Sequence, residues 1–164
     1  MGTAFSDPGR GESKATVLIV DDNVQNLELL EAYMAELPEV RPITATNGIE
    51  ALEKVASDRP DLILLDIMMP RMSGFEVCRH IKADPHTRDI PIIMVTALDE
   101  LGDEERAREC GADEFVCKPV NRADLTNRVR NLLRVRQMKS ERARPPVSRP
   151  GRSSRPAGRE EWPS

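Results

Sequence analysis

The feature that most constrains the fold is an alternation of short apolar runs with stretches of helical spacing. The apolar runs are five in number and cover residues 17–20, 43–45, 62–65, 92–95 and 115–117. Runs that are apolar on both faces are typical of strands covered by helices on both sides. The alternation therefore predicts an α/β fold, with βα units built around a doubly wound, five-stranded parallel sheet.

Between these runs, apolar residues recur at the spacing of a helix. The sets are Leu27, Leu30, Met34 and Leu37; Ile49, Leu52 and Val55; Phe75, Cys78 and Ile81; and Leu125, Val129, Leu132 and Leu133. Each set is expected to form one stripe that packs on the sheet. The segment 98–110 is dominated by charged residues, so we expect its helix to be the most loosely held of all.

The length and the charge distribution predict one folded domain with two different ends. A chain of 164 residues accommodates about one domain. Its net charge of −4 divides into −8 over residues 1–138 and +4 over residues 139–164. We expect a disordered lead-in over residues 1–15, a folded domain over 16–138 and a disordered, basic Pro/Arg-rich tail over 139–164.

Several functional classes are disfavoured by the composition. The most apolar stretch, residues 62–69, is interrupted by Asp66, so no membrane span is predicted. No secretory signal is apparent, and the three cysteines match neither a two-bridge framework nor a Cys-x-x-Cys metal site, which favours a cytoplasmic location. The basic tail lacks interleaved aromatic residues, so nucleic-acid binding is not favoured.

Polar residues follow four of the predicted strands at the point where each strand ends. They are Asp21 and Asp22, Asp66, Thr96, and Lys118. Because ligands bind beyond the carboxyl ends of the strands in open parallel sheets, we expect these side chains to converge at one edge.

Each of these residues also has a local explanation. Asp22 or Asn23 could cap a helix, Asp66 could open a turn, and Thr96 could be an ordinary strand-end hydroxyl. Lys118 and the proline after it could form a plain loop. Agreement at four strand ends nevertheless favours a joint functional site.

Three carboxylates in one small cleft repel one another, by about 4 kcal/mol per pair at 4 Å and an effective dielectric of 20. Lys118 alone leaves the cleft negative, so either one aspartate is protonated or a hard cation binds. Mg²⁺ suits a site of few carboxylates that is completed by water and phosphate oxygens. With a hydroxyl and an ammonium group nearby, the set predicts a site that forms an aspartyl phosphate.

The combined motifs closely resemble the receiver domain of bacterial two-component response regulators, the CheY-like superfamily. They are VLIVDD at 17–22, LILLDIMMP at 62–70, GFE at 74–76, VTA at 95–97 and KP at 118–119. The resemblance covers residues 16 to about 136. It implies a flavodoxin-like (βα)5 fold with strand order 2-1-3-4-5.

The resemblance also implies roles for individual residues. Asp66 corresponds to the phospho-accepting aspartate. Asp22, Asp66 and the backbone carbonyl of Met68 correspond to ligands of Mg²⁺, with Asp21 in water-mediated support. Thr96 and Lys118 correspond to groups that bind phosphoryl oxygens.

The remaining implied features concern switching. The backbone amide of Ala97 would bind the phosphoryl group, and Thr96 and Phe115 would move together on activation. A cis peptide bond between Lys118 and Pro119 is implied as well.

The implied partners are a sensor histidine kinase or histidine phosphotransfer protein, which supplies the phosphoryl group, and a downstream protein target. The output face would comprise the segment 99–110, the fifth strand and the last helix. The same face could support a homodimer, with ion pairs from Arg128, Arg130, Arg134 and Arg136, or those arginines could simply be solvated. The predicted activity is that of a signalling switch rather than an enzyme.

Two alternatives accompany this interpretation. A Mg²⁺-dependent phosphatase that turns over an aspartyl phosphate would use a similar edge, but it usually carries a general-acid aspartate two residues after its nucleophile, where this sequence has Met68. No second globular pattern follows residue 138. The chain could therefore be a stand-alone receiver, or it could be a receiver fragment of a larger regulator.

Overall fold

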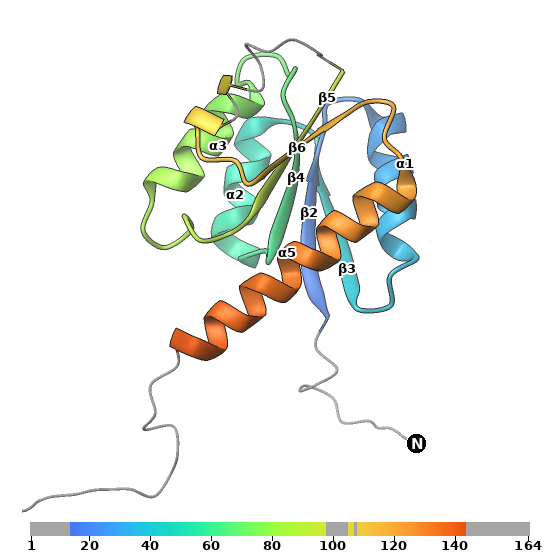
Figure 1. The fold of residues 1–164 in the computed structure, drawn as a ribbon. Helices are drawn as coiled ribbons and strands as arrows, with labels where there is room; N and C mark the ends of the chain where they lie inside the picture. The colour runs from blue at the N-terminus through green and yellow to red at the C-terminus, as the bar shows by residue number, and fades with distance from the viewer. Residues whose placement is uncertain (1–13, 98–104, 107, 144–164) are drawn as a thin grey trace, which may run out of the picture. The chain divides into compact units, whose positions relative to one another are not determined.

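The structure is a computed structural model that describes residues 14–97, 105–106 and 108–143 (Figure 1). The chain divides into two units, residues 1–133 and 134–164. The sheet and the helices that cover it, including the first turns of the last helix, belong to the first unit. Within the second unit, the described residues form the last turns of α5 (Arg122–Ala143).

Five parallel strands form one sheet. They are β2 (Ala15–Val20), β3 (Val40–Ala45), β4 (Leu62–Asp66), β5 (Ile92–Thr96) and β6 (Glu114–Cys117). Their spatial order is β3-β2-β4-β5-β6, with every neighbouring pair parallel. Counted along the chain this is the order 2-1-3-4-5, so the predicted doubly wound fold is confirmed.

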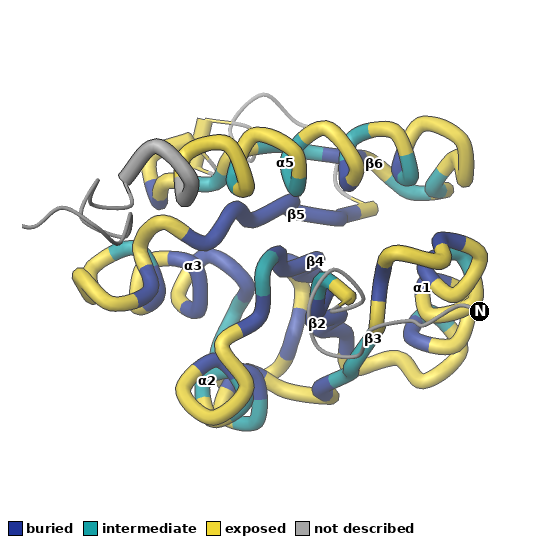
Figure 2. The backbone as a smooth tube through the Cα atoms, turned by 90° about the horizontal axis from the view of Figure 1, so that it is seen from below, coloured by how far each residue is buried: buried dark blue, intermediate teal, exposed yellow. Residues whose placement is uncertain are grey.

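Helices cover both faces of the sheet, and each face has its own apolar cluster. α1 (Val24–Ala35) and the first turns of α5 pack on one face, where they bury Val17 and Ile19 of β2. α2 (Gly48–Asp58) and α3 (Gly74–Ala83) pack on the other face and bury Leu18 and Val20. This division follows from the alternation of side chains along a strand. β4 and β5, in the middle of the sheet, are buried throughout (Figure 2).

The predicted apolar stripe of α2 is wrong at its first position. Ile49 is 57% exposed, whereas Ala51 and Val55 are buried and Leu52 is half-buried. Asn47 caps the helix through its side chain, and Gly48 is the first helical residue. From that start, residues 51 and 55 lie four apart on the sheet-facing side, and Ile49 points away from it.

Part of the segment expected to be a loosely held helix, residues 98–104 and 107, lies outside the described residues. The described part is helical at 105–106 and 108–109, and Cys110 that follows is buried. Residues 1–13 and 144–164 also lie outside the described part of the chain. α5 continues beyond Met138 to Ala143.

No helix among the described residues combines the length and the apolar character that crossing a membrane requires.

Candidate functional site

The register of the sheet brings the predicted site residues to one edge. Val20 pairs with Leu65, so Asp21 and Asp66 follow at the same level on neighbouring strands. Thr96, the last residue of β5, pairs with Cys117. Lys118 therefore leaves β6 at this same carboxyl edge, and its amide donates a hydrogen bond to the carbonyl of Thr96 (N–O 2.6 Å).

Three carboxylates and one ammonium group meet there. Asp21, Asp22 and Asp66 each offer a carboxylate oxygen, and these oxygens all lie within 4.8 Å of one another. Asp21 and Asp66 are buried, whereas Asp22 is exposed. The Nζ of Lys118 lies 3.2 Å from Asp21 Oδ2 and 3.3 Å from Asp66 Oδ1. The structure thus assembles the cluster from segments as far apart as residues 21 and 118.

Helix capping does not account for the paired aspartates. Asn23 is the N-cap of α1, and its side chain accepts a hydrogen bond from the amide of Asn26 (3.1 Å). Asp21 Oδ1 accepts the amide hydrogen of Asn23 (2.9 Å), while its other oxygen faces Lys118. Asp21 therefore links the start of the helix to the cluster.

The single lysine of the cluster does not balance the negative charge of its three carboxylates. Burial raises the pKa of Asp66 to about 6, and repulsion from Asp21 adds to this, while attraction by Lys118 opposes it. Burial also disfavours the charged form of Lys118, but attraction by Asp66 and Asp21 outweighs that effect and raises its pKa.

This donor set fits a divalent cation. Hard cations such as Mg²⁺ and Ca²⁺ prefer oxygen ligands, and a cation would relieve the repulsion that adds to the effect of burial on the pKa of Asp66. The three aspartates are a group of acidic side chains that could bind a metal ion.

The raised pKa of Asp66 predicts a stability that depends on pH. Between the ordinary aspartate pKa of 3.8 and the raised pKa of about 6, the folded state holds a proton that the unfolded state has released, so the stability falls as the pH rises through this window. Above it, the ionised carboxylate is a cost to the fold. At pH 7.5 and without divalent ions, we expect the free energy of unfolding of Asp66→Asn to be about 2 kcal/mol higher than that of wild type.

Urea denaturation at several pH values, in the presence of a chelator, measures this difference. The advantage of Asp66→Asn should shrink as the pH falls from 6 to 4. Asp22→Asn is the matched control, because the exposed Asp22 side chain gains little from losing its charge. Equal stability of Asp66→Asn and wild type across the whole range would contradict the assigned electrostatics.

The other predicted residues lie around the cluster in different settings. Thr96 is fully buried and Ala97, which follows it, is exposed. Phe115 is half-buried and packs against the apolar cluster beneath α2 and α3. Met68 is 60% exposed in the loop after β4. The peptide bond between Lys118 and Pro119 is cis, as predicted.

Only glycine fits at position 74, where α3 begins against the main chain of Asp66. A Cβ at this position would lie 2.2 Å from the carbonyl oxygen of Asp66 and 2.8 Å from the Cα of Ile67. The amide of Gly74 donates to the carbonyl of Ile67 (2.9 Å). Main chain therefore approaches main chain at this point, and the contact fixes the loop that carries Asp66.

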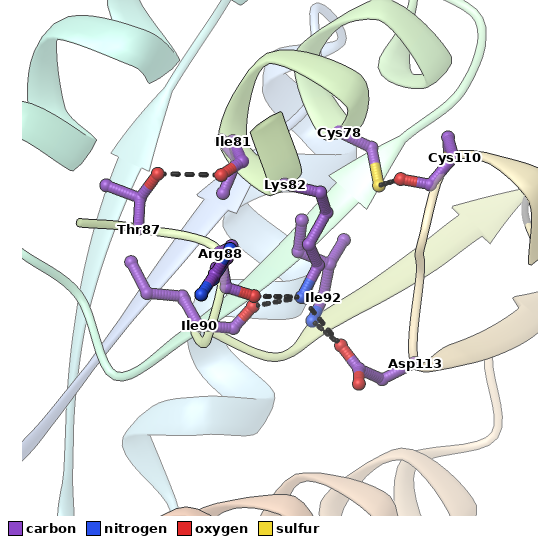
Figure 3. Close-up of polar contacts among 9 residues, drawn as sticks. All are labelled: Cys78, Ile81, Lys82, Thr87, Arg88, Ile90, Ile92, Cys110 and Asp113. Carbon is purple, nitrogen blue, oxygen red and sulfur yellow. Dashed lines mark hydrogen bonds and ion pairs between the residues drawn. The ribbon is translucent and has the colours of Figure 1, made fainter. Parts of the chain in front are cut away.

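Two contacts outside the acidic cluster were not predicted from the sequence. The Nζ of Lys82 donates to the carbonyls of Arg88 and Ile90 and pairs with Asp113 (Figure 3). The guanidinium of Arg106 lies 4.2 Å from the centre of the Phe75 ring, at the start of α3. The pairs Lys82–Asp113 and Arg106–Phe75 each join residues about 30 positions apart, which helical or strand periodicity cannot reveal.

The fold and the edge cluster together define a class of α/β domain in which acidic residues and a lysine face one another beyond the carboxyl ends of a parallel sheet. The response regulator receiver domain family matches residues 17–130 of this chain. The chain therefore belongs to the response regulator receiver domain family, whose members are signalling switches that interact with histidine kinases and downstream effectors.

Individual relatives agree with this assignment. Response regulator PleD of Caulobacter vibrioides is 50% identical over 123 residues, which are 74% of this chain and 27% of PleD. Polar-differentiation response regulator DivK of Brucella anthropi is 42% identical over 106 residues, 65% of this chain and 85% of DivK. The chain thus spans little more than a quarter of the length of PleD.

A solved structure shows the same fold. The signal receiver domain of a signal transduction histidine kinase from Syntrophus aciditrophicus is 37% identical to this chain, with a TM-score of 0.69. The match covers 74% of this chain and 91% of that domain.

Proposed function

We propose that this chain accepts a phosphoryl group on Asp66 from a phosphohistidine of a sensor histidine kinase or histidine phosphotransfer protein. The observation that carries the proposal is the cluster of Asp21, Asp22 and Asp66, in which Asp21 and Asp66 lie 3.2 and 3.3 Å from the Nζ of Lys118. Membership of the receiver family supports it.

Asp21, Asp22 and Asp66, with the backbone carbonyl of Met68, would hold Mg²⁺ in this proposal. The cation would neutralise the charge of the carboxylates and of the incoming phosphoryl oxygens. An oxygen of Asp66 bonds to phosphorus as the phosphorus–nitrogen bond of the phosphohistidine breaks. The electron pair of that bond stays on the ring nitrogen.

Lys118, Thr96 and the amide of Ala97 are assigned to the phosphoryl oxygens. Lys118 already faces Asp66, Thr96 is the last residue of the neighbouring strand β5, and Ala97 follows it. Hydrogen bonds to charged groups contribute about 1.5–3 kcal/mol each, and moving a population from 1:99 to 99:1 requires about 5.5 kcal/mol. Two or three such contacts therefore suffice to drive a switch.

The output would pass through Thr96 and Phe115 to the face formed by the segment 99–110, β6 and α5. On the described part of this face, arginines of α5 already have partners within the chain. Arg128 pairs with Asp124 and Glu114, and Arg130 pairs with Glu39 (2.8 Å). A homodimer that used these two arginines would have to exchange ion pairs, so we favour a downstream protein as the occupant.

Incubation with a small acyl phosphate and Mg²⁺ tests the proposal. Wild type should gain one stable phosphoryl group per chain, a chelator should prevent the gain, and Asp66→Asn should acquire none. Asp58→Asn, which changes an exposed carboxylate at the end of α2, is the control and should label like wild type. Label on another residue would refute the role of Asp66, and continuous release of phosphate would identify a phosphatase instead.

A further inference from the structure

Cys78 and Cys110, which are 32 positions apart in the sequence, lie in contact in the core. Cys78 lies on α3 and is fully buried, and Cys110 ends the helical turn that precedes β6 and is 5% exposed. The thiol of Cys78 donates a hydrogen bond to the carbonyl oxygen of Cys110 (Sγ–O 3.3 Å; Figure 3). Neither cysteine is in a disulfide, so the contact runs from one free thiol to the main chain that carries the other.

A second contact holds the two segments in register. Lys82, one turn after Cys78 on α3, pairs with Asp113, which lies just beyond Cys110 (Nζ–Oδ2 3.2 Å). The same oxygen of Asp113 accepts the amide hydrogen of Ile92 (2.9 Å), which ties this turn to β5. The two segments are therefore held together at two points, which keeps the sulfur of Cys78 beside the main chain of Cys110.

The environments of the two thiols are unequal. A hydrogen bond from Cys78 lowers the pKa of Cys110 to about 7, against the opposing effect of burial. The same interaction, with burial, raises the pKa of Cys78. At neutral pH Cys110 is thus the better nucleophile, because the thiolate is the reactive form, and Cys78 is suited to resolve its oxidised product.

A lone buried cysteine usually serves only as a small apolar core residue. This pair differs because the thiol of Cys78 contacts the main chain of Cys110, and an ion pair holds the same two segments together. Cytosolic disulfides, where they occur, are usually transient and redox-sensing.

We propose that Cys78 and Cys110 form a reversible oxidation site, which closes into a disulfide when a peroxide reaches it and so ties α3 to the turn before β6. The inference goes beyond the proposed function and does not depend on it.

The chemistry balances with hydrogen peroxide as the oxidant. The thiolate of Cys110 attacks one peroxide oxygen, the oxygen–oxygen bond breaks, and water leaves after protonation, which gives a sulfenic acid. The sulfur of Cys78 then bonds to the sulfur of Cys110 and expels a second water. Two thiols lose two electrons and two protons, and one peroxide becomes two waters. The low exposure of both sulfurs restricts the reaction to an oxidant of about this size.

The bridge should stabilise the fold, because it closes a long loop that the unfolded chain would otherwise leave open. Loops of this length correspond to a rise in Tm on the order of 10 °C in a domain of this size. Hydrogen exchange should slow in the described residues from 105 to 117.

The Cys117→Ser variant gives the clearest test, since it removes the exposed thiol and leaves the pair intact. Native protein is titrated with hydrogen peroxide, and its free thiols and intact mass are followed. We expect both thiols to disappear together, the monomer to lose two hydrogens, and a linked peptide to join Cys78 to Cys110. Dithiothreitol should reverse every change.

Two further variants separate the roles in the Cys117→Ser background. Cys78→Ala should leave a sulfenic acid at Cys110 that dimedone traps, and Cys110→Ala should leave Cys78 unreactive. Retention of both thiols in folded Cys117→Ser, at peroxide levels that oxidise Cys117 in wild type, would overturn the proposal. So would a linkage that forms only after unfolding. Asp66→Asn in the same background should form the disulfide between Cys78 and Cys110 normally. A failure of the proposed phosphorylation can therefore be distinguished from a failure of the proposed oxidation.

Discussion

Lys82→Met is expected to lower the free energy of unfolding by about 2–4 kcal/mol, because hydrogen bonds to a charged group contribute about 1.5–3 kcal/mol each. The ammonium group is largely buried and donates to the carbonyls of Ile90 (2.7 Å) and Arg88 (3.0 Å). Methionine matches the length and apolar stem of lysine but donates nothing. The variant would leave the buried carbonyl of Ile90 and the carboxylate of Asp113 without this partner.

Lys54→Met is the matched control for that change. Lys54 also extends from a helix to a strand carbonyl, that of Thr44 (2.6 Å), but its side chain is twice as exposed as that of Lys82. Water can replace its contacts, so we expect a loss below about 1 kcal/mol. Urea denaturation of both variants measures the contrast. Equal losses would show that Lys82 does not join α3 to β5 and β6 as described.

Gly74→Ala is expected to destabilise the domain by about 3 kcal/mol, at the upper end of the cost of overpacking. Alanine would normally favour the folded state slightly, since it restricts the unfolded chain. Here its Cβ would meet the carbonyl oxygen of Asp66 at 2.2 Å, and main chain at a strand end cannot rotate away. The clash must displace the loop that carries Asp66, so uptake of phosphate from a small acyl phosphate should also slow.

Gly48→Ala is the counterpart, because Gly48 likewise begins a helix. The three atoms nearest to its added Cβ would all belong to the side chain of Met72, with Sδ at 2.8 Å and both Cβ and Cγ at 2.9 Å, and Met72 lies half-buried in a loop. This neighbour can move, so the cost should be at least about 1 kcal/mol smaller than at Gly74, with phosphate uptake unchanged. Unfolding curves and the rates of phosphate uptake of the two variants measure this difference. A Gly74→Ala protein as stable and as quickly labelled as Gly48→Ala would refute the close approach.

The candidate site could be predicted because its residues occupy equivalent places in successive βα units. Asp21, Asp66, Thr96 and Lys118 each end or follow an apolar run, and parallel strands bring such positions to a common edge. The distances around Lys118 and the burial that raises the pKa of Asp66 required the assembled structure. Both depend on which side chains surround the cluster in space.

Local pattern in the sequence determined the five strands, most of the apolar helix stripes and the edge that gathers the polar groups, because these depend on periods of two and of about 3.6 residues along one segment. Tertiary structure alone decided that Ile49 faces outward and that Cys78 meets Cys110 beside Lys82 and Asp113. Contacts of this second kind are set by how separate elements approach each other, and no spacing within one element encodes that approach.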